Sequence, residues 1–389
     1  MAARTLVALS IGVHAGNAAA QASTPPVPAP AWRLDALYKA DLLHARKPAI
    51  DAAVDFLDVA LTLDAAALFG WDATTIRVEA LSTHGGKPNH TLGSYGGISN
   101  LEVAANSARL YATWIARDIT PAWSVLAGLY DLNSEFYATD ASALLAHPAF
   151  GIGTEFGQSG RSGPSIFPDL SLGVRLRDHD ANGFYAQAAV LDGVPGTPGH
   201  TGRTTVRLSR DDGALLVGEG GWQNAESGGH VGLGVWGYTR PATRLDGVGE
   251  ARNRGAYALA QAVVAAGPIA RTTGFVRFGI ADGRLNPVDA AAEIGALVER
   301  PFGDAGPSAF TIGLTAARIS ASQRTLNGAD GRTTARAEAA AEAGLRWRLG
   351  THASLQPFVQ RWWNAGGQDG ARTTVLGLHF EATLKPSPP

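Results

Sequence analysis

Apolar and polar residues alternate in long stretches of this chain. Residues 57–64, LDVALTLD, place an aliphatic side chain at every second position, with acidic, small or hydroxyl side chains between them. Residues 338–349, EAAAEAGLRWRL, continue the same period for twelve positions, with small or apolar residues on one row and two Glu and two Arg on the other. Because successive side chains of a strand point to opposite faces, this pattern predicts β-strands with one apolar face.

About sixteen segments of this kind follow one another along the chain. They lie near residues 57–65, 74–81, 106–115, 122–131, 170–177, 184–191, 203–209, 214–222, 231–238, 255–263, 274–280, 291–298, 308–317, 337–349, 353–361 and 373–384. Strands of roughly ten residues are the length that crosses a bilayer, whereas soluble sheets typically use about five or six. The pattern therefore predicts an all-β fold, a transmembrane antiparallel β-barrel of about 16 strands.

Two details of this prediction concern its ends and its sidedness. Between Trp32 and Ala53, the segment ALYKADLLHARK has helical spacing and predicts a short periplasmic helix before the first strand. Counting strands back from the C-terminus then puts the longest connection, Leu132–Asp169, on the periplasmic side, where barrel turns are short. Either a strand is hidden in that connection or one of the predicted strands is false.

The composition favours a barrel and disfavours several other classes. Only 17% of the 389 residues are charged, against the roughly 25% usual in soluble proteins, and there are 48 glycines. The formal net charge of -2 gives no electrostatic footprint for nucleic acid. The absence of cysteine excludes disulfides, Cys-ligated zinc and thiol catalysis.

The N-terminus has the features of an export signal. One early positive charge, an apolar stretch near residues 6–13 and an A-x-A pattern ending at Ala22 predict a signal peptide over residues 1–22. Residues 23–52 then form a Pro-rich start and a short periplasmic segment, and residues 53–389 form the barrel. The rest of the chain contains no run of 18 apolar residues, so the sequence predicts no membrane-spanning helix.

Two motifs suggest ligand sites but fit strands and turns better. DHDANG, residues 178–183, has the start of a calcium loop, yet position 189 is Ala189 and not the required Glu, so a hairpin turn is expected. GLGVWG, residues 232–237, has dinucleotide-loop spacing but stands inside an alternating strand. We therefore expect no metal, no cofactor and no enzymatic activity.

The polar rows of the predicted strands should project into the barrel lumen. The charged residues on these rows are Arg77, Glu79, Arg109, Arg175, Arg177, Arg207, Arg277, Glu338, Glu342, Arg346 and Arg348. They either hydrate the wall and pair with one another, or form a constriction of mixed sign that suits neutral polyols. Tryptophans near segment ends, at 114, 123, 222, 236, 362 and 363, are expected to form interfacial girdles or to pack in the core.

The segment LAGLYDLNSEF, residues 126–136, ends a predicted strand on Asp131, Asn133 and Glu135, followed by Phe136. Asp and Asn after a strand commonly make turns. Carboxylates and amides beside an aromatic ring are also what sugar hydroxyls and sugar faces require. We add these three polar residues to the candidates for the substrate path.

These segments, in this order, resemble the carbohydrate-selective porin (OprB) family. The resemblance rests on THGGKPN, ISNLE, RLYATW, AGLYDLNSEF, RSGPSIFPDLSLGVRL, AVLDGVPG, GALLVGEGGW, GHVGLGVWGYT, LQPFVQRWWNAGG and VLGLHF, and covers roughly residues 53–384. It implies an outer-membrane barrel, commonly of sixteen strands, through which glucose and other sugars diffuse. Residues Asp131, Asn133, Glu135 and Phe136 match the family's D-x-N-x-E-F pattern, and Pro357, Gln360, Asn364, Gly366 and Gly367 match its closing signature.

The chain departs from the family at two points. Ala365 stands where the family usually has Pro, and the chain runs on through KPSPP after its last predicted strand. The resemblance implies facilitated diffusion of carbohydrates across the outer membrane of a Gram-negative bacterium, with lipid around the barrel and no nucleic acid partner. An exported soluble sugar-binding β-protein is the alternative. The sugar transported and the oligomeric state stay open.

Overall fold

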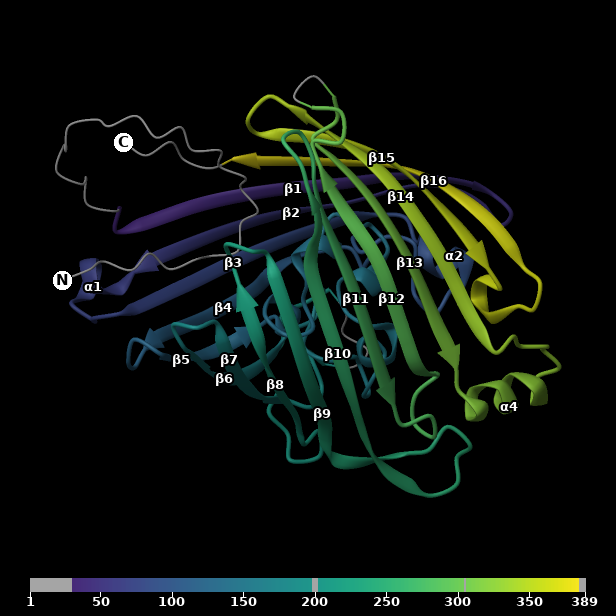
Figure 1. Cartoon of the computed structure of the whole chain (residues 1–389). Coiled ribbons are helices and arrows are strands. Elements are labelled where there is room, and N and C mark those ends of the chain that lie inside the picture. Colours follow the sequence, from purple (N-terminus) through teal and green to yellow (C-terminus); the bar gives the residue numbers. More distant parts are fainter. Residues whose placement is uncertain (1–29, 198–201, 304–305, 385–389) are drawn as a thin grey trace. The chain divides into compact units, whose positions relative to one another are not determined.

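The computed structural model describes residues 30–197, 202–303 and 306–384. The predicted signal peptide lies outside the described residues, as does most of the Pro-rich stretch that follows it. The described residues form one closed antiparallel barrel in which each strand pairs with its neighbours in the sequence, and the first strand pairs with the last (Figure 1). The predicted fold class and the strand count are confirmed.

The sixteen strands of the described chain are long. They are β1 (Trp32–Arg46), β2 (Ala49–Asp64), β3 (Thr74–Gly85), β4 (Ser107–Asp118), β5 (Trp123–Tyr130), β6 (Ser171–His179), β7 (Phe184–Asp192), β8 (Ala214–Asn224), β9 (Gly229–Thr243), β10 (Glu250–Ala266), β11 (Arg271–Ala281), β12 (Val288–Glu299), β13 (Ala309–Ile319), β14 (Ala337–Leu349), β15 (Ala353–Trp363) and β16 (Arg372–Leu384). The register of the closing pair sets Ala36 of β1 opposite Leu384 of β16.

Short helices occur in the connections. These are α1 (Ala65–Phe69), α2 (Pro88–Leu92), α3 (Thr154–Gly157) and α4 (Ala321–Ala329), with 3-10 turns η1 (Leu132–Ser134), η2 (Asp140–Ser142), η3 (Pro148–Phe150) and η4 (Ala365–Gly367). Across the described part of the chain, none of these helices has the length and apolar character needed to cross a membrane.

Two of the predicted elements are wrong, and together they explain the sidedness conflict. The expected periplasmic helix is strand β1, so the barrel begins at Trp32 and not near residue 53. Its period of two was obscured because Leu37 and Leu43 stand on the same row as Asp35, Lys39 and Asp41. The predicted strand at 203–209 is absent, since those residues belong to the connection between β7 and β8.

With these corrections, the connections divide into a short and a long set. At the end that carries both strand termini, the connections span residues 65–73, 119–122, 180–183, 225–228, 267–270, 300–308 and 350–352. The opposite end has the long connections 86–106, 131–170, 193–213 and 320–336, as well as shorter ones. The Leu132–Asp169 segment therefore lies at the long-loop end, as barrel topology requires.

The outer face of the barrel is apolar. Exposed side chains on outward rows include Val174, Val190, Leu216, Val231, Leu233, Val235, Val276, Phe278, Ile280, Ile294, Ile312, Leu314 and Leu376. Glu338 and Glu342 occupy the opposite, inward row of β14 and are buried. The predicted division into an apolar outer row and a polar inner row is thus present in the strands.

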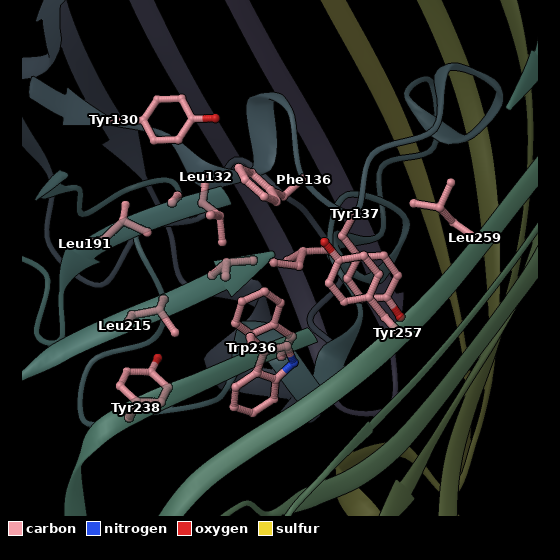
Figure 2. Close-up of a cluster of buried hydrophobic side chains, with 14 of the residues drawn as sticks. Tyr130, Leu132, Phe136, Tyr137, Leu191, Leu215, Trp236, Tyr238, Tyr257 and Leu259 are labelled. Carbon is pink, nitrogen blue, oxygen red and sulfur yellow. The ribbon is translucent and has the colours of Figure 1, made fainter. Parts of the chain in front are cut away.

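The interior holds more aromatic side chains than the sequence indicated (Figure 2). Tyr257 and Trp236 point inward, where Tyr257 stacks on Tyr137 and Trp236 stacks on Phe156, both of the 131–170 connection. Gly234 makes this possible, because a β-carbon there would overlap the Tyr257 ring. Trp236 and Trp362 are buried inside the barrel and do not join an interfacial girdle, while Trp123 is exposed on the outer wall.

Candidate functional site

The connection between β5 and β6, residues 131–170, folds into the barrel, and we call it the inner loop. Asp131 begins it by accepting hydrogen bonds from the Asn133 backbone N–H at 2.9 Å and from the Tyr111 hydroxyl at 2.6 Å. Desolvation raises the pKa of Asp131 to about 6, against the lowering effect of these hydrogen bonds. The side chain of Asn133 donates to the carbonyls of Phe136 and Gly151, so it holds the loop together.

Carboxylates of the barrel wall hold the inner loop by its backbone. Glu342 of β14 accepts from the N–H of Ala146 at 2.7 Å and of His147 at 2.9 Å. Glu219 of β8 accepts from the N–H of Tyr137 at 2.9 Å. Because β8 and β14 are far apart in the strand order, these contacts fix the loop across the lumen. Burial lowers the pKa of His147 to about 3, so its ring is neutral.

Arg277 of β11 holds the loop from a third direction. Its guanidinium donates to the carbonyl oxygens of Ala149, Phe150 and Gly151, and it lies 4.6 Å from the centre of the Tyr137 ring. It also lies 3.7 Å from the carboxylate of Glu293. Arg277 is fully buried, so its Nη1 and Nη2 donors are used in the loop contact and not displayed on an open wall.

A buried acid lies beside this guanidinium. Glu155 of α3 accepts from the Tyr137 hydroxyl at 3.2 Å, while its other oxygen and both oxygens of Glu293 accept no hydrogen bond from the described residues. Burial raises the pKa of Glu155 to about 7. Two carboxyl groups thus share one arginine in a dry environment, which favours a proton on this pair.

A second inward connection, residues 86–106, is held in the same manner. Glu338 of β14 accepts from the backbone N–H of Tyr95 at 3.0 Å, of Gly96 at 3.1 Å and of Gly366 at 2.7 Å. Gln360 of β15 donates to the carbonyl of Ile98 at 2.8 Å. Glu338 and Glu342 therefore act as acceptors for loop backbone, a use that the sequence pattern did not indicate.

One polar group near the start of the inner loop retains access to solvent. Glu135 forms a two-bond ion pair with Arg175 at 2.8 Å and lies 3.7 Å from Arg177. Arg177 stands 5.5 Å from the ring centre of Tyr185. Glu135 and Arg177 are each about a fifth to a quarter exposed, whereas Arg175 is buried. The predicted residues Glu135, Arg175 and Arg177 are brought together.

The second group, which we call the wall cluster, consists of Lys39, Asp58, Arg77, Glu79, Arg346 and Glu381. Arg346 and Lys39 both contact Glu381, at 2.8 and 3.5 Å, and Arg77 pairs with Glu79 at 2.7 Å. The members come from β1, β2, β3, β14 and β16, which are successive strands except for β15. The cluster has three cations and three carboxylates; Glu79 is buried, and the other five members keep partial solvent exposure inside the barrel.

The other predicted residues are distributed differently. Arg109 pairs with Asp169 at 2.6 Å, close to the end of the inner loop. Arg207 pairs with Asp212 at 2.5 Å but lies off the strands, so its predicted place on a strand wall is wrong. Arg348 is exposed at the short-turn end of β14.

Sequence reasoning missed Lys39, Asp58 and Glu381. Lys39 lies in a segment whose helical spacing masks the strand alternation of β1. Asp58 and Glu381 were each seen opposite an apolar row but were not selected as lumen residues. Their alternation with outward Leu57 and Phe380 carries the same signal that identified Glu79 and Arg346.

The DHDANG segment spans the end of β6 and the turn between β6 and β7. The Asp180 carboxylate accepts from the backbone N–H of Asn182 at 2.9 Å and of Phe184 at 2.8 Å, and Gly183 has a positive φ of 93°. No group of three or more His, Cys, Asp or Glu side chains with the spacing of a metal site occurs within residues 30–197, 202–303 and 306–384. The hairpin prediction is confirmed.

The family can now be assigned. The sequence profile of the carbohydrate-selective porin, OprB family, matches residues 52–384. The chain belongs to this family. The match covers most of the barrel, and the family and fold are those of a channel. A search of curated proteins found no match.

Solved porin structures have the same fold. A structure of Pseudomonas putida OprB at high pH superposes with a TM-score of 0.77 at 18% identity, covering 91% of this chain and 94% of that one. The outer membrane channel DcaP of Acinetobacter baumannii gives a TM-score of 0.56 at 10% identity, covering 91% and 96%. The anion-selective porin of Comamonas acidovorans gives 0.54 at 11% identity, covering 91% and 99%. At these identities the likeness concerns the fold.

Proposed function

We propose that this porin carries neutral sugars by facilitated diffusion across the outer membrane of a Gram-negative bacterium. The observation that carries the proposal is the wall cluster, in which three cations and three carboxylates lie on inward rows of adjoining strands, all of them partly exposed except the buried Glu79. Its balanced charge supplies hydrogen-bond donors and acceptors without favouring either sign of ion.

The mechanism follows from the chemistry of hydroxyl groups. Each sugar hydroxyl both donates and accepts, so a guanidinium beside a carboxylate, such as Arg77 beside Glu79, replaces two of its water contacts at once. The wall cluster and the Glu135–Arg175–Arg177 group offer two such binding sites. Weak binding at more than one site lets a sugar leave as readily as it enters.

The outward rows support the membrane location. Val231, Leu233 and Val235 of β9 are each more than half exposed, as are several side chains on other strands. A soluble sugar-binding protein would place such a row against water, at roughly 25 cal/mol for each Å² exposed. The long connections then face the cell exterior and the short turns face the periplasm.

Transport and location are tested separately. Purified protein should need detergent and should migrate differently on gels before and after heating, because a closed barrel resists unfolding. Partition into buffer without detergent, with no heat-modifiable migration, would instead support the soluble alternative. We propose no enzymatic activity for this protein.

Proteoliposome flux assays test the wall cluster. Arg77→Ala combined with Glu79→Ala removes one donor–acceptor pair and leaves the net charge unchanged. We expect slower flux of glucose, used as a neutral probe sugar, and an unchanged ratio of cation to anion permeability. The matched control is Asp330→Ala with Arg332→Ala, which removes an exposed ion pair of 2.9 Å in the 320–336 connection. Equal glucose flux in both folded variants would remove the Arg77–Glu79 pair from the sugar path.

A further inference from the structure

We infer that a groove on the outer wall of the barrel, over β3, β4 and β5, binds an anionic phospholipid. The groove has a volume of about 250 Å³ and an almost entirely apolar lining. It is lined by Trp71, Thr74, Ile115, Arg117, Val125 and Ala127. This inference rests on the proposal that the barrel spans a membrane.

Arg117 lies on the outer wall, on the same row as exposed Ile115, and its β-sheet partner on β5 is Val125. Its guanidinium forms no hydrogen bond or ion pair with any side chain in the described ranges. Asp118, adjacent in sequence, and Asp72, in the connection that precedes β3, are not paired with it. The guanidinium is therefore free to pair with a charge from outside the chain.

The surroundings of Arg117 are apolar and aromatic. Trp71 from the 65–73 connection, Ile119 and Trp123 are all 40 to 60% exposed at this end of the barrel. Tryptophan rings at a barrel rim lie at the depth of the lipid headgroups. An arginine at that depth is drawn to phosphate, because its planar fork matches two phosphate oxygens.

The shape of the groove selects the lipid and not a free anion. An acyl chain lies along Ile115, Val125 and Ala127, while the phosphate meets Arg117. Inorganic phosphate would satisfy the charge but make no contact with the apolar lining. A net negative headgroup, such as phosphatidylglycerol, binds more tightly than a zwitterionic one, whose ammonium opposes the guanidinium. The groove lies near the short turns, so the lipid belongs to the leaflet on that side.

Native mass spectrometry of the detergent-purified full chain tests this site. The barrel is titrated with phosphatidylglycerol, with phosphatidylethanolamine and with inorganic phosphate. We expect one lipid molecule to be retained selectively from phosphatidylglycerol. Arg117→Gln should weaken that binding about fivefold, and Arg117→Lys should restore most of it. Ala127→Phe should also weaken it by filling the groove without changing a charge.

The matched control is Arg161→Gln, which removes an exposed arginine of the inner loop away from the groove. An equal loss of phosphatidylglycerol binding in this variant, or equal retention of both lipids, would overturn the inference. So would binding of inorganic phosphate as strong as that of the lipid. Sugar flux of the wild type is measured in parallel. Flux without selective lipid retention refutes the lipid site alone, whereas absent flux refutes the proposed transport.

Discussion

The carboxylate of Glu342 on β14 accepts the backbone N–H of Ala146 at 2.7 Å, across 196 positions of sequence. The same carboxylate accepts the N–H of His147, so one wall residue holds two consecutive peptide groups of the inner loop. The bonds join the loop to a strand remote from those that carry it.

Glu342→Ala should therefore loosen the inner loop without opening the barrel. Two buried N–H groups lose their acceptor, at about 1–3 kcal/mol each, so the free energy of unfolding in denaturant should fall. Single-channel recordings should show larger and noisier conductance. Glu342→Gln, which keeps an acceptor oxygen, serves as the control and should show a smaller effect. An unchanged channel in Glu342→Ala would mean that the loop is held sufficiently by its other contacts.

Arg346→Ala should change ion selectivity. The substitution removes the 2.8 Å partner of Glu381 and leaves the wall cluster with two cations and three carboxylates. We expect the reversal potential in a salt gradient to shift toward cation selectivity and the glucose flux to fall. Arg348→Ala, on the same inward row but exposed at the short-turn end, should shift the potential less. Equal shifts would indicate a general charge effect and no special role for the cluster.

Ala343→Arg should destabilise the barrel from its lipid side. Ala343 stands on the outer row between exposed Ile312 and Val359, its neighbours on β13 and β15. A charge at mid-depth in lipid costs about 2–4 kcal/mol. Ala343→Leu is the matched variant and should leave the free energy of unfolding in lipid nearly unchanged. Tolerance of Ala343→Arg would contradict the assigned faces of β14.

The stability of the inner loop should depend on pH through Glu155. Its pKa is about 7 in the folded protein, above its ordinary value of 4.5, because burial disfavours the ionised form. An acid whose pKa is raised in the folded protein contributes to the free energy of unfolding when it is protonated. The contribution of Glu155 is fully present below about pH 4.5 and is lost as the pH rises through about 7. The total loss is about 3 kcal/mol, at about 1.4 kcal/mol for each pKa unit.

Glu155→Gln provides the comparison for that profile. Denaturant unfolding of both proteins at several pH values should show the free-energy difference changing between about pH 4.5 and 7, in the direction that penalises the wild type at higher pH. Arg277 and Glu293 are the charged groups near Glu155, and the substitution leaves Glu293 as the one carboxyl group beside the guanidinium. A difference that does not vary with pH would show that Glu155 does not titrate in this range.

The barrel was predictable because strand alternation is a local signal. Outward Leu216 and inward Glu219 belong to rows that can be recognised without any knowledge of their neighbours. The signal failed at β1, where Leu37 and Leu43 interrupt the polar row, and at residues 203–209, which alternate but have no strand to pair with. Pairing is a property of the closed sheet, so no short window of sequence contains it.

The sequence predicted which candidate side chains point into the barrel, but not which groups they contact there. Arg277, Glu338 and Glu342 do point inward, yet each is buried under a connection that returns into the barrel. The path of the inner loop depends on distant wall residues acting together, which alternation cannot show. Arg346, Glu79 and Glu381 lie on inward rows that their alternation indicates, while Lys39 can be placed only once residues 32–46 are known to form β1.

The hold on the inner loop is made largely to peptide groups, which every amino acid carries. Glu219, Arg277 and Glu342 form these hydrogen bonds with backbone N–H and C=O groups of the loop, so the bonds do not depend on which side chains the loop carries. The solvent-facing residues of the loop are therefore free to change in evolution or by design while the clamp persists. The folding of the channel and its solute selectivity can therefore change independently. New selectivity can arise by substitutions in one loop inside an unaltered barrel.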